Sequence, residues 1–176
     1  EGVDYSIIER VGELTLYHHT STSEITSRVS AAEVVIVNKV KMFREQIDAA
    51  PKLKLICVAA TGTNNVDSEY AASKGILVKN VVGYSTESVV QITFGAILAL
   101  VNHTIYFDNQ VKSGEYSKSL HFTDTGRSFS EISGKNFGII GMGNIGKRVA
   151  EIATVFGANV MYYSTAGKPH CKKYPA

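Results

Sequence analysis

The sequence has no tryptophan, three prolines and only two cysteines among its 176 residues. Cys57 and Cys171 are far apart, and neither has a metal-ligand spacing with any of the five histidines, so we expect no metal site. Cys57 lies in an apolar, strand-like run, which indicates a buried and reduced thiol. A reduced thiol favours a cytoplasmic protein.

A strong charge and a long apolar run are lacking as well. The net charge of +2 is too small to indicate nucleic acid or an acidic membrane as a partner. No run of about 18 apolar residues occurs, so we expect no transmembrane span. A hydrophobic content of 44% and a charged content of 19% are ordinary for a soluble globular protein.

The most informative stretch is residues 136–150, where an apolar run leads into a glycine-rich turn and then into a helical pattern. Gly141, Gly143 and Gly146 have the spacing G-x-G-x-x-G. In dinucleotide-binding proteins the first glycine permits a tight turn, the second lets the backbone approach a pyrophosphate, and the third lets the helix pack close to the strand. Residues 159–163 predict the next strand.

Glycines at this spacing also mark plain turns, so a purely structural turn is the alternative to a dinucleotide site. The strand predicted before the turn and the helix predicted after it favour the dinucleotide site. The start of that helix offers unpaired N–H groups and a positive dipole end to an anion. The predicted cofactor contacts at the turn are Gly141, Gly143, Asn144, Ile145 and Gly146.

Upstream of this stretch, predicted strands and helices alternate, which is typical of a parallel α/β sheet. We expect strands at residues 14–18, 33–38, 53–59 and 76–80, and helices at residues 6–13, 21–29, 42–50 and 67–75. The continuous β-branched run in residues 33–38 predicts a fully buried strand. Ser21 and Glu24 form a capping-box pattern, and Asp67 and Gly75 are a helix cap and a helix stop.

The pattern changes after residue 86. Residues 87–112 are apolar nearly all round and contain no proline, which predicts one deeply buried helix of more than about 30 Å, long enough to connect two domains. Residues 113–133 are polar and irregular, so we expect a surface excursion. The strand and helix pattern stops after Tyr163. The chain therefore supplies only two of the roughly six strands of a doubly wound dinucleotide domain. We therefore expect a truncated piece of a longer polypeptide, which also fits a start at Glu1 without Met.

Three motifs point to a family. They are residues 60–67 (ATGTNNVD), residues 80–91 (NVVGYSTESVVQ) and residues 134–135 leading into the glycine turn. In order and spacing they resemble the D-isomer-specific 2-hydroxyacid dehydrogenases, nearest to the bacterial glycerate dehydrogenases, or hydroxypyruvate reductases. The resemblance covers nearly all of the chain. It implies a flavodoxin-like substrate domain in residues 1–82 and the start of a Rossmann cofactor domain in residues 83–176. It also implies that the long helix joins the two domains, that the active site lies in a cleft between them, and that the protein is a homodimer through the cofactor domain.

The resemblance also indicates where a small 2-keto acid substrate binds. In an open α/β sheet, ligands lie beyond the carboxyl ends of the strands. Thr61, Gly62 and Thr63 follow the third predicted strand, and the resemblance implies that their N–H groups bind the substrate carboxylate; a simple strand-to-helix turn is the alternative. Lys39 follows the second predicted strand, and it either pairs with the carboxylate or is solvated.

Two further regions are implied at the ends of the cofactor. Thr86 begins the long helix, where the resemblance implies a contact near the nicotinamide; Ser85 or Thr86 also suits a helix cap, and both roles are compatible. Family members that prefer NAD carry an Asp at the end of the second cofactor-domain strand, whereas this chain has Ser164 and then Thr165. Lysines follow nearby, at positions 168, 172 and 173. Without the carboxylate a 2′-phosphate is not repelled, so we expect NADPH to be slightly favoured over NADH. The alternative is that Ser164 bonds the ribose of NAD and the lysines are solvated.

The catalytic groups that the resemblance implies are a His acid/base, a Glu that supports it and an Arg that orients the keto acid. All three are expected downstream of residue 176, so no catalytic residue is assigned in this chain, and residues 1–176 alone are expected to be inactive. For the full-length protein, the implied reaction is hydride transfer between NAD(P)H and a small 2-keto acid such as hydroxypyruvate or glyoxylate. The alternative is a non-catalytic, NAD(P)-responsive binding or corepressor-like module, which does not need those three groups.

Overall fold

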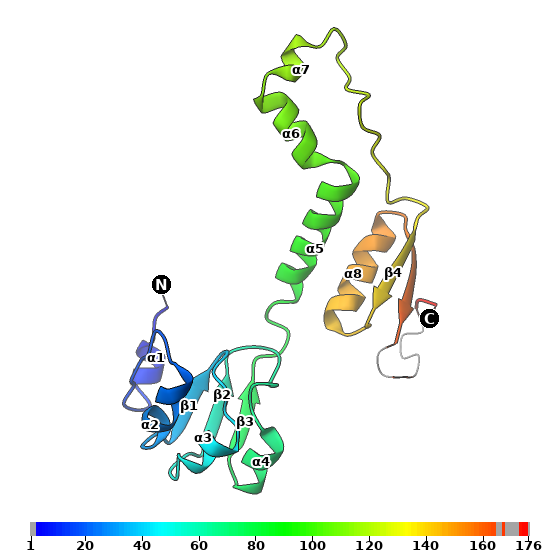
Figure 1. Ribbon diagram of the computed structural model, residues 1–176. Helices are drawn as coiled ribbons and strands as arrows, with labels where there is room; N and C mark the ends of the chain where they lie inside the picture. Colours follow the sequence, from blue (N-terminus) through cyan, green and yellow to red (C-terminus); the bar gives the residue numbers. More distant parts are fainter. Residues whose placement is uncertain (1–2, 165–166, 168–172, 176) are drawn as a thin grey trace. The chain divides into compact units, whose positions relative to one another are not determined.

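The computed structural model describes residues 3–164, 167 and 173–175, and it divides the chain into two compact units (Figure 1). Unit 1 is Glu1–Val82 and unit 2 is Gly83–Ala176. Each unit contains only parallel strand pairs among the described residues, three strands in unit 1 and two in unit 2. The predicted α/β fold is therefore confirmed.

Unit 1 is built on a sheet with the strand order β1-β2-β3, comprising Val34–Val37, Leu55–Val58 and Leu77–Asn80. Its helices are α1 (Ser6–Glu9), η1 (Thr22–Glu24), α2 (Ile25–Val29), α3 (Arg44–Asp48) and α4 (Ser68–Ser73). The strands are in register, with Val34 opposite Leu55 and Leu55 opposite Leu77. The core lies where α2, α3 and α4 pack on one face of this sheet, and it includes the fully buried Ile56.

The predicted helix caps of unit 1 are confirmed. The carboxylate of Glu24 accepts hydrogen bonds from the Ser21 N–H at 2.8 Å and from the Ser21 hydroxyl at 2.6 Å, as expected for a capping box. Asp67 caps α4 by accepting from the Tyr70 N–H at 3.0 Å. Gly75 ends the segment with φ +75°, a left-handed conformation that favours glycine.

Two predictions for unit 1 are wrong. Residues 14–18 are not a strand; the Tyr17 ring instead lies 4.1 Å under the Arg28 guanidinium, and β propensity without a neighbouring strand does not form a ladder. Strand β1 is not fully buried either, because Val34 and Ile36 are 51% and 49% exposed. Their side chains lie on the sheet face that no helix covers among the described residues.

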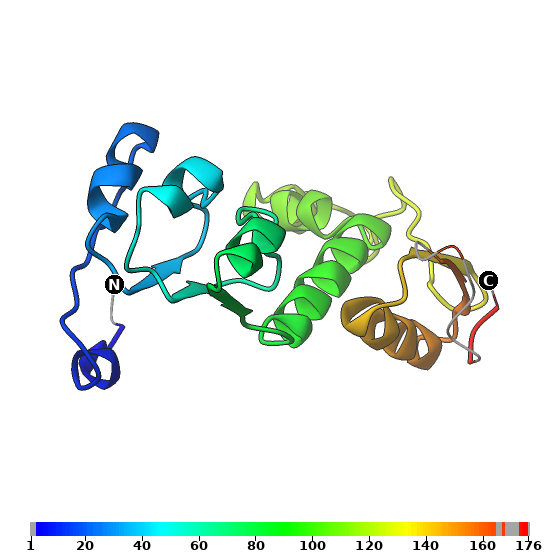
Figure 2. The ribbon, with the colours of Figure 1, turned by 90° about the horizontal axis from the view of Figure 1, so that it is seen from below.

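Unit 2 contains α5 (Thr86–Val101), α6 (Thr104–Lys112), α7 (Glu115–Lys118), β4 (Asn136–Ile140), α8 (Asn144–Val155) and β5 (Asn159–Tyr163). Strands β4 and β5 pair with Asn136 opposite Asn159, and α8 packs beside them (Figures 1 and 2). Helix α5 joins this core through Phe94, whose ring stacks on Phe137 and Phe156 with centroid distances of 6.3 and 5.6 Å. The strand–turn–helix–strand order predicted around the glycine turn is confirmed.

The single long helix predicted for residues 87–112 is wrong. The chain forms α5 and α6, bent by 65° at a break where His103 has φ 50°. The break is held by the returning loop, because the Ser130 N–H donates to the Val101 carbonyl at 3.0 Å and the Ser128 carbonyl lies 3.1 Å from the His103 ring. Among the described residues no single helix is long and apolar enough to cross a membrane; α5 and α6 together meet that test by length and composition only.

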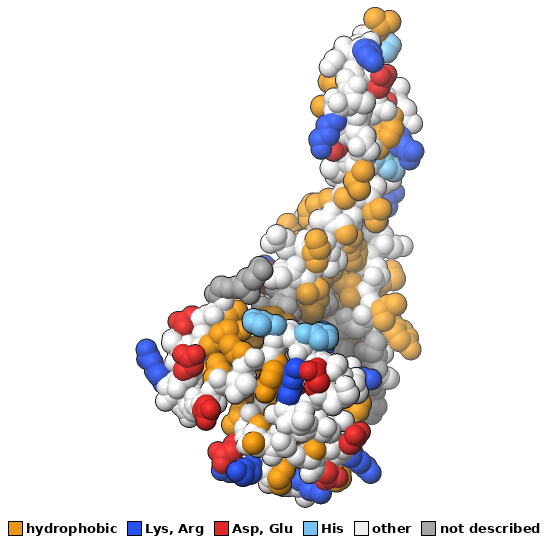
Figure 3. Space-filling view, turned by 60° about the vertical axis from the view of Figure 1, so that its left-hand side comes forward, with side chains coloured by type: hydrophobic (Ala, Val, Ile, Leu, Met, Phe, Trp, Pro, Cys, Tyr) orange, Lys and Arg blue, Asp and Glu red, His pale blue; other side chains and the backbone are white. Residues whose placement is uncertain are grey.

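The deep burial predicted for this helix is wrong as well. Only Val90 and Phe94 of α5 are buried in the described structure, whereas Ile92 and Leu100 are 70% and 74% exposed. Figure 3 shows hydrophobic side chains on the surface of this segment. The face of α5 that packs on α8 is one stripe of an all-round apolar helix, so the rest of its apolar surface stays exposed.

Candidate functional site

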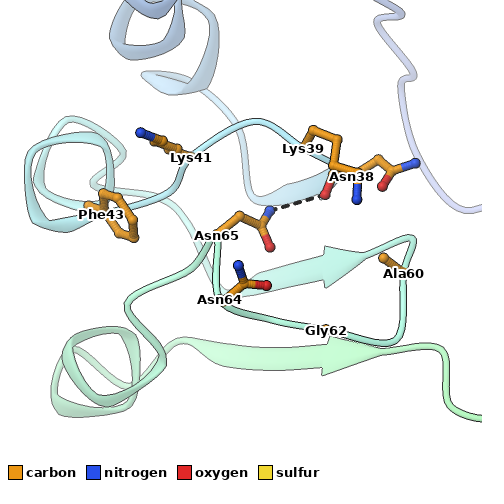
Figure 4. A pocket seen from close by; sticks show the side chains of 8 residues that line it. All are labelled: Asn38, Lys39, Lys41, Phe43, Ala60, Gly62, Asn64 and Asn65. Carbon is orange, nitrogen blue, oxygen red and sulfur yellow. Dashed lines mark hydrogen bonds between the residues drawn. The ribbon is translucent and has the colours of Figure 1, made fainter.

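The first candidate site is an open pocket of about 250 Å³ in unit 1 (Figure 4). It lies between the loop that follows β1 and the loop that follows β2, at the carboxyl ends of these strands. The lining residues are Asn38, Lys39, Lys41, Phe43, Ala60, Gly62, Asn64 and Asn65. The lining contains two lysines and three asparagines and no carboxylate, so it suits a small anion.

Backbone donors add to this character. The N–H groups of Thr61, Gly62 and Thr63 have no hydrogen-bond acceptor among the described residues. The Thr61 carbonyl accepts from the Asn80 side chain at 2.6 Å, which ties the loop to the end of β3. The loop is thus held in place while its donors remain available to a ligand.

The pocket brings together some of the predicted substrate residues. Lys39 and Gly62 line it, whereas Thr61 and Thr63 flank Gly62 on the same loop without lining it. Sequence reasoning did not name Lys41, Phe43, Asn64 or Asn65 as site residues. For Lys41, Asn64 and Asn65 the available signal was their place in the connections that follow two predicted strands, since ligands lie beyond the carboxyl ends of parallel strands. Phe43 fell inside the predicted helix 42–50, so no such signal marked it.

The second candidate site is the glycine turn of unit 2. Gly141 has φ +90°, and its N–H donates to the Tyr163 carbonyl at 3.0 Å, so the turn is joined to the end of β5. A Cβ on Gly146 would overlap the carbonyl oxygen of Gly141, whereas a Cβ on Gly143 would meet open space. The first and third glycines are therefore required by the backbone itself, and the second leaves room for an approaching group.

The start of helix α8 is the donor end of this site. No side chain caps the helix in the described structure, and Gly143 is its N-cap residue. The N–H groups of Asn144, Ile145 and Gly146 have no acceptor in the parts of the chain that the structure describes. Three free donors at the positive end of a helix of 12 residues suit a phosphate or pyrophosphate.

Thr86 lies in the first turn of α5 and is half-buried, with Ser85 as the N-cap residue. The next residue, Glu87, accepts from the Arg148 guanidinium of α8 at 3.1 Å. Hydrogen bonds to Glu151 and Glu87 raise the pKa of Arg148 above its ordinary value. The ion pair brings the first turn of α5, and with it Thr86, close to the start of α8.

The residues predicted at the adenosine end are described only in part. Ser164 is half-buried and directly follows Tyr163, whose carbonyl binds the glycine turn. Thr165, Lys168 and Lys172 lie outside the described residues. Lys173 is described, with its ammonium 5.4 Å from the centre of the neighbouring Tyr174 ring.

Unit 2 has a glycine turn between a parallel strand and a helix, and unit 1 is a parallel α/β unit with an anion-type pocket. These features define the class: an α/β protein of Rossmann type. A family model described as "D-isomer specific 2-hydroxyacid dehydrogenase, catalytic domain" matches residues 3–167. The chain belongs to the D-isomer-specific 2-hydroxyacid dehydrogenase family, as the sequence motifs predicted.

Individual relatives agree with this assignment. The chain is similar to the hydroxypyruvate reductase of Blautia hydrogenotrophica, with 34% identity over 170 residues that cover 95% of this chain and 53% of the relative. Among solved structures, it resembles a D-lactate dehydrogenase from Aquifex aeolicus complexed with NAD and lactic acid, with a TM-score of 0.81, 29% identity and coverage of 96% of this chain and 49% of the other. It also resembles an acyclic imino acid reductase in complex with NADPH and D-Arg, with a TM-score of 0.84, 25% identity and coverage of 97% and 54%. The chain spans about half the length of the curated relatives that it matches.

Proposed function

We propose that the protein is an oxidoreductase that transfers a hydride between NAD(P)H and a small 2-keto acid, such as hydroxypyruvate or glyoxylate. The observation that carries this proposal is the glycine turn, where the Gly146 backbone lies against Gly141 and the first N–H groups of α8 are free. A dinucleotide pyrophosphate fits these donors and the open space at Gly143. The relative named a hydroxypyruvate reductase and the structure with bound lactic acid support the substrate class.

The two candidate sites have different roles in this proposal. The residues that would hold the cofactor are Gly141, Gly143, Asn144, Ile145, Gly146, Thr86 and Ser164. When bound, a nicotinamide cofactor supplies the hydride. The N–H groups of Thr61, Gly62 and Thr63 would bind the substrate carboxylate, and Lys39 would add a positive charge beside it. On this proposal unit 1 is the substrate domain and unit 2 is the cofactor domain.

The choice between the two cofactors is a separate proposal. Ser164 stands where family members that prefer NAD carry an Asp, so we propose that the protein accepts NADPH and slightly prefers it to NADH. Similar structures have been solved with either NAD or NADPH, and they therefore leave this choice to the residues of each chain. Titration of the intact protein with both reduced cofactors tests it, and binding of NADH about tenfold tighter than NADPH would refute the preference.

Two further proposals concern the whole protein. We propose a homodimer that forms through unit 2, because the apolar side chains exposed there include Leu120 at 97% and Phe122 at 92%. We also propose a cytoplasmic location, which the half-buried free thiol of Cys57 supports.

The direct test of the proposed function is steady-state reduction of glyoxylate and hydroxypyruvate by the intact protein, followed by the loss of NADH or NADPH absorbance. Turnover of either keto acid supports the proposal. Tight cofactor binding without turnover of any small 2-keto acid would instead indicate the non-catalytic binding module. The inactivity expected of residues 1–176 alone stays a prediction, and an assay of that piece beside the intact protein tests it.

A further inference from the structure

The side chain of Asn65 holds the two loops of the unit 1 pocket together. Its amide nitrogen donates to the Asn38 carbonyl at 3.3 Å, across 27 positions of the sequence (Figure 4). It also donates to the Val40 carbonyl at 2.9 Å, across 25 positions. An amide NH₂ has two hydrogens, so both of its donors are used here. Both acceptors belong to the loop after β1, and Asn65 itself belongs to the loop after β2.

The two carbonyls lie on either side of one residue, Lys39. The Asn65 amide therefore fixes the backbone immediately before and after the lysine that lines the pocket. The main chain continues the contact, because the Met42 N–H donates to the Asn65 carbonyl at 2.8 Å and Met42 forms a parallel bridge with Val66. The Asn65 side chain is the part of this junction that a substitution can remove without touching the backbone.

We propose that Asn65 is a positioning residue for the substrate: it holds Lys39 and the loop after β1 at a fixed distance from the free N–H groups of residues 61–63. This role rests on the proposed function, since it assigns the substrate carboxylate to the same pocket. Asn65 acts through its neighbours, because its own donors are used by the two carbonyls and are not available to a ligand. A fixed pocket binds a small anion more tightly than two loops that move independently, since less ordering is needed on binding.

The test compares Asn65→Asp with Ile76→Val in the intact protein. Asn65→Asp keeps the shape of the side chain but replaces both donors by an acceptor, which faces two carbonyl oxygens. We expect the KM for glyoxylate to rise about tenfold or more, with kcat within about threefold of the wild type, because two hydrogen bonds are replaced by repulsion. The KM for the reduced cofactor should stay within about twofold, since that site is built by unit 2.

Ile76→Val is the matched control for a loss of stability alone. Ile76 is a buried core residue just before β3, at the amino end of the sheet, whereas the pocket lies at the carboxyl ends of β1 and β2. This variant should lower the melting temperature by a few degrees, because a buried methyl group is lost, without changing the KM for glyoxylate. A KM that rises equally in both variants would show that Asn65 acts only through stability, and would overturn the positioning role.

A pH profile gives a readout that a merely structural role would not produce. The introduced carboxyl group would face the Asn38 and Val40 carbonyls, which favour its neutral form, while Lys39 and Lys41, which line the same pocket, favour its charged form. The balance of these groups sets its pKa. Below that pKa it is protonated and regains one donor, so the KM of Asn65→Asp should fall back towards the wild-type value as the pH falls. Should this variant fail to fold, the same constants are to be read from Asn65→Ser, for which a similar rise in KM is expected.

The remaining outcomes separate the two proposals. A wild-type protein that turns over glyoxylate, together with an Asn65→Asp variant whose KM stays within about twofold, overturns the positioning role and leaves the proposed function intact. A wild-type protein that reduces no small 2-keto acid overturns the proposed function, and the role of Asn65 in that reaction falls with it.

Discussion

The α-carbon of Gly146 lies so close to the carbonyl oxygen of Gly141 that a side chain at position 146 would overlap it. The contact joins the first turn of α8 to the turn that ends β4, and both residues belong to the G-x-G-x-x-G pattern. Neither atom can give way cheaply, because the oxygen is part of the backbone that also binds β5 through the Gly141 N–H.

Gly146→Ala should therefore destabilise unit 2 by at least about 2 kcal/mol, the cost of forcing helix and strand apart. Urea unfolding measures this change. Gly95→Ala is the control, because it lies inside α5 with open space around its α-carbon. That variant should gain about 0.5–1 kcal/mol from the higher helix propensity of alanine. Equal stability of Gly146→Ala and the wild type would contradict the close contact.

Gly143→Ala should separate binding from folding at the same turn. Gly143 has φ −76° and open space at its Cβ position, so alanine fits the free protein. Its stability should change by less than about 0.5 kcal/mol. The added methyl group occupies the space that a pyrophosphate would approach, and the Kd for NADPH or NADH should rise about tenfold, which corresponds to about 1.4 kcal/mol. Fluorescence titration of the intact protein measures it, and unchanged affinity would argue against a pyrophosphate at this turn.

The sequence was sufficient for features that depend on near neighbours. The glycine spacing, the Ser21–Glu24 capping box and the Asp67 cap each depend on residues within five positions of one another, and all are present in the structure. The break at His103 was not predictable in this way, since no glycine or proline marks it. It is held by hydrogen bonds to the loop around Ser128 and Ser130, at least 25 positions away.

The same distinction applies to the candidate site. Strand periodicity identified the two loops that follow β1 and β2. Lys39 was found from its place after β1, and Gly62 from its place after β2 together with the family resemblance. The bond from Asn65 to the Asn38 carbonyl spans 27 positions and leaves no local pattern. The burial of β1 was overestimated for a related reason. A run of valines and isoleucines shows which residues can be buried, but the helices that pack on the sheet decide which of its two faces is buried.

The exposed cluster of Asp48, Tyr70 and Lys74 gives a pH-dependent prediction. The Lys74 ammonium at 2.7 Å and the Tyr70 hydroxyl at 2.8 Å lower the pKa of the Asp48 carboxyl below its ordinary value, and Asp48 in turn raises the pKa of Lys74. Because the carboxyl pKa is lower in the folded state, its contribution to stability is present above the unfolded pKa and is lost as the pH falls through the folded pKa. The contribution of Lys74 to stability has the opposite pH dependence. It is present below the pKa that the lysine has in the unfolded chain, and it is lost as the pH rises through the pKa of the folded state.

Tyr70→Phe should therefore raise the pKa of Asp48 towards its ordinary value while leaving it lowered, since Lys74 remains. Carboxyl NMR titration measures the shift. The difference in stability between Tyr70→Phe and the wild type should shrink as the pH falls. The Tyr70 hydroxyl stabilises the charged form of the Asp48 carboxyl, and this form disappears on protonation. Tyr17→Phe is the control: this ring keeps its contact with Arg28, and its substitution should not move the pKa of Asp48. A pKa unchanged by Tyr70→Phe would contradict the prediction.

Leu120 and Phe122 test the proposed homodimer. Both side chains are more than nine-tenths exposed and make no contribution to the buried core that the structure describes. Replacing both by serine should leave the melting temperature of a single chain unchanged and weaken self-association, so that sedimentation changes from dimer to monomer. Val11→Ser, at an 85% exposed position in unit 1, should leave the dimer intact. A double variant that still sediments as a dimer would place the interface elsewhere.

Ser164→Asp tests the proposed cofactor preference at the residue that carries it. Ser164 follows β5 directly, and the carbonyl of the preceding Tyr163 accepts from the Gly141 N–H, so position 164 lies next to the turn proposed to bind the pyrophosphate. A carboxylate there would accept bonds from the ribose hydroxyls of NADH and repel the 2′-phosphate of NADPH. We expect the KM for NADPH to rise about tenfold and the KM for NADH to fall, since a hydrogen bond to a charged group contributes about 1.5–3 kcal/mol. Ser164→Asn, similar in size but uncharged, should leave the KM for NADPH near its wild-type value. An equal effect of both variants would mean that size rather than charge determines the preference, and no effect of either would move the ribose site away from Ser164.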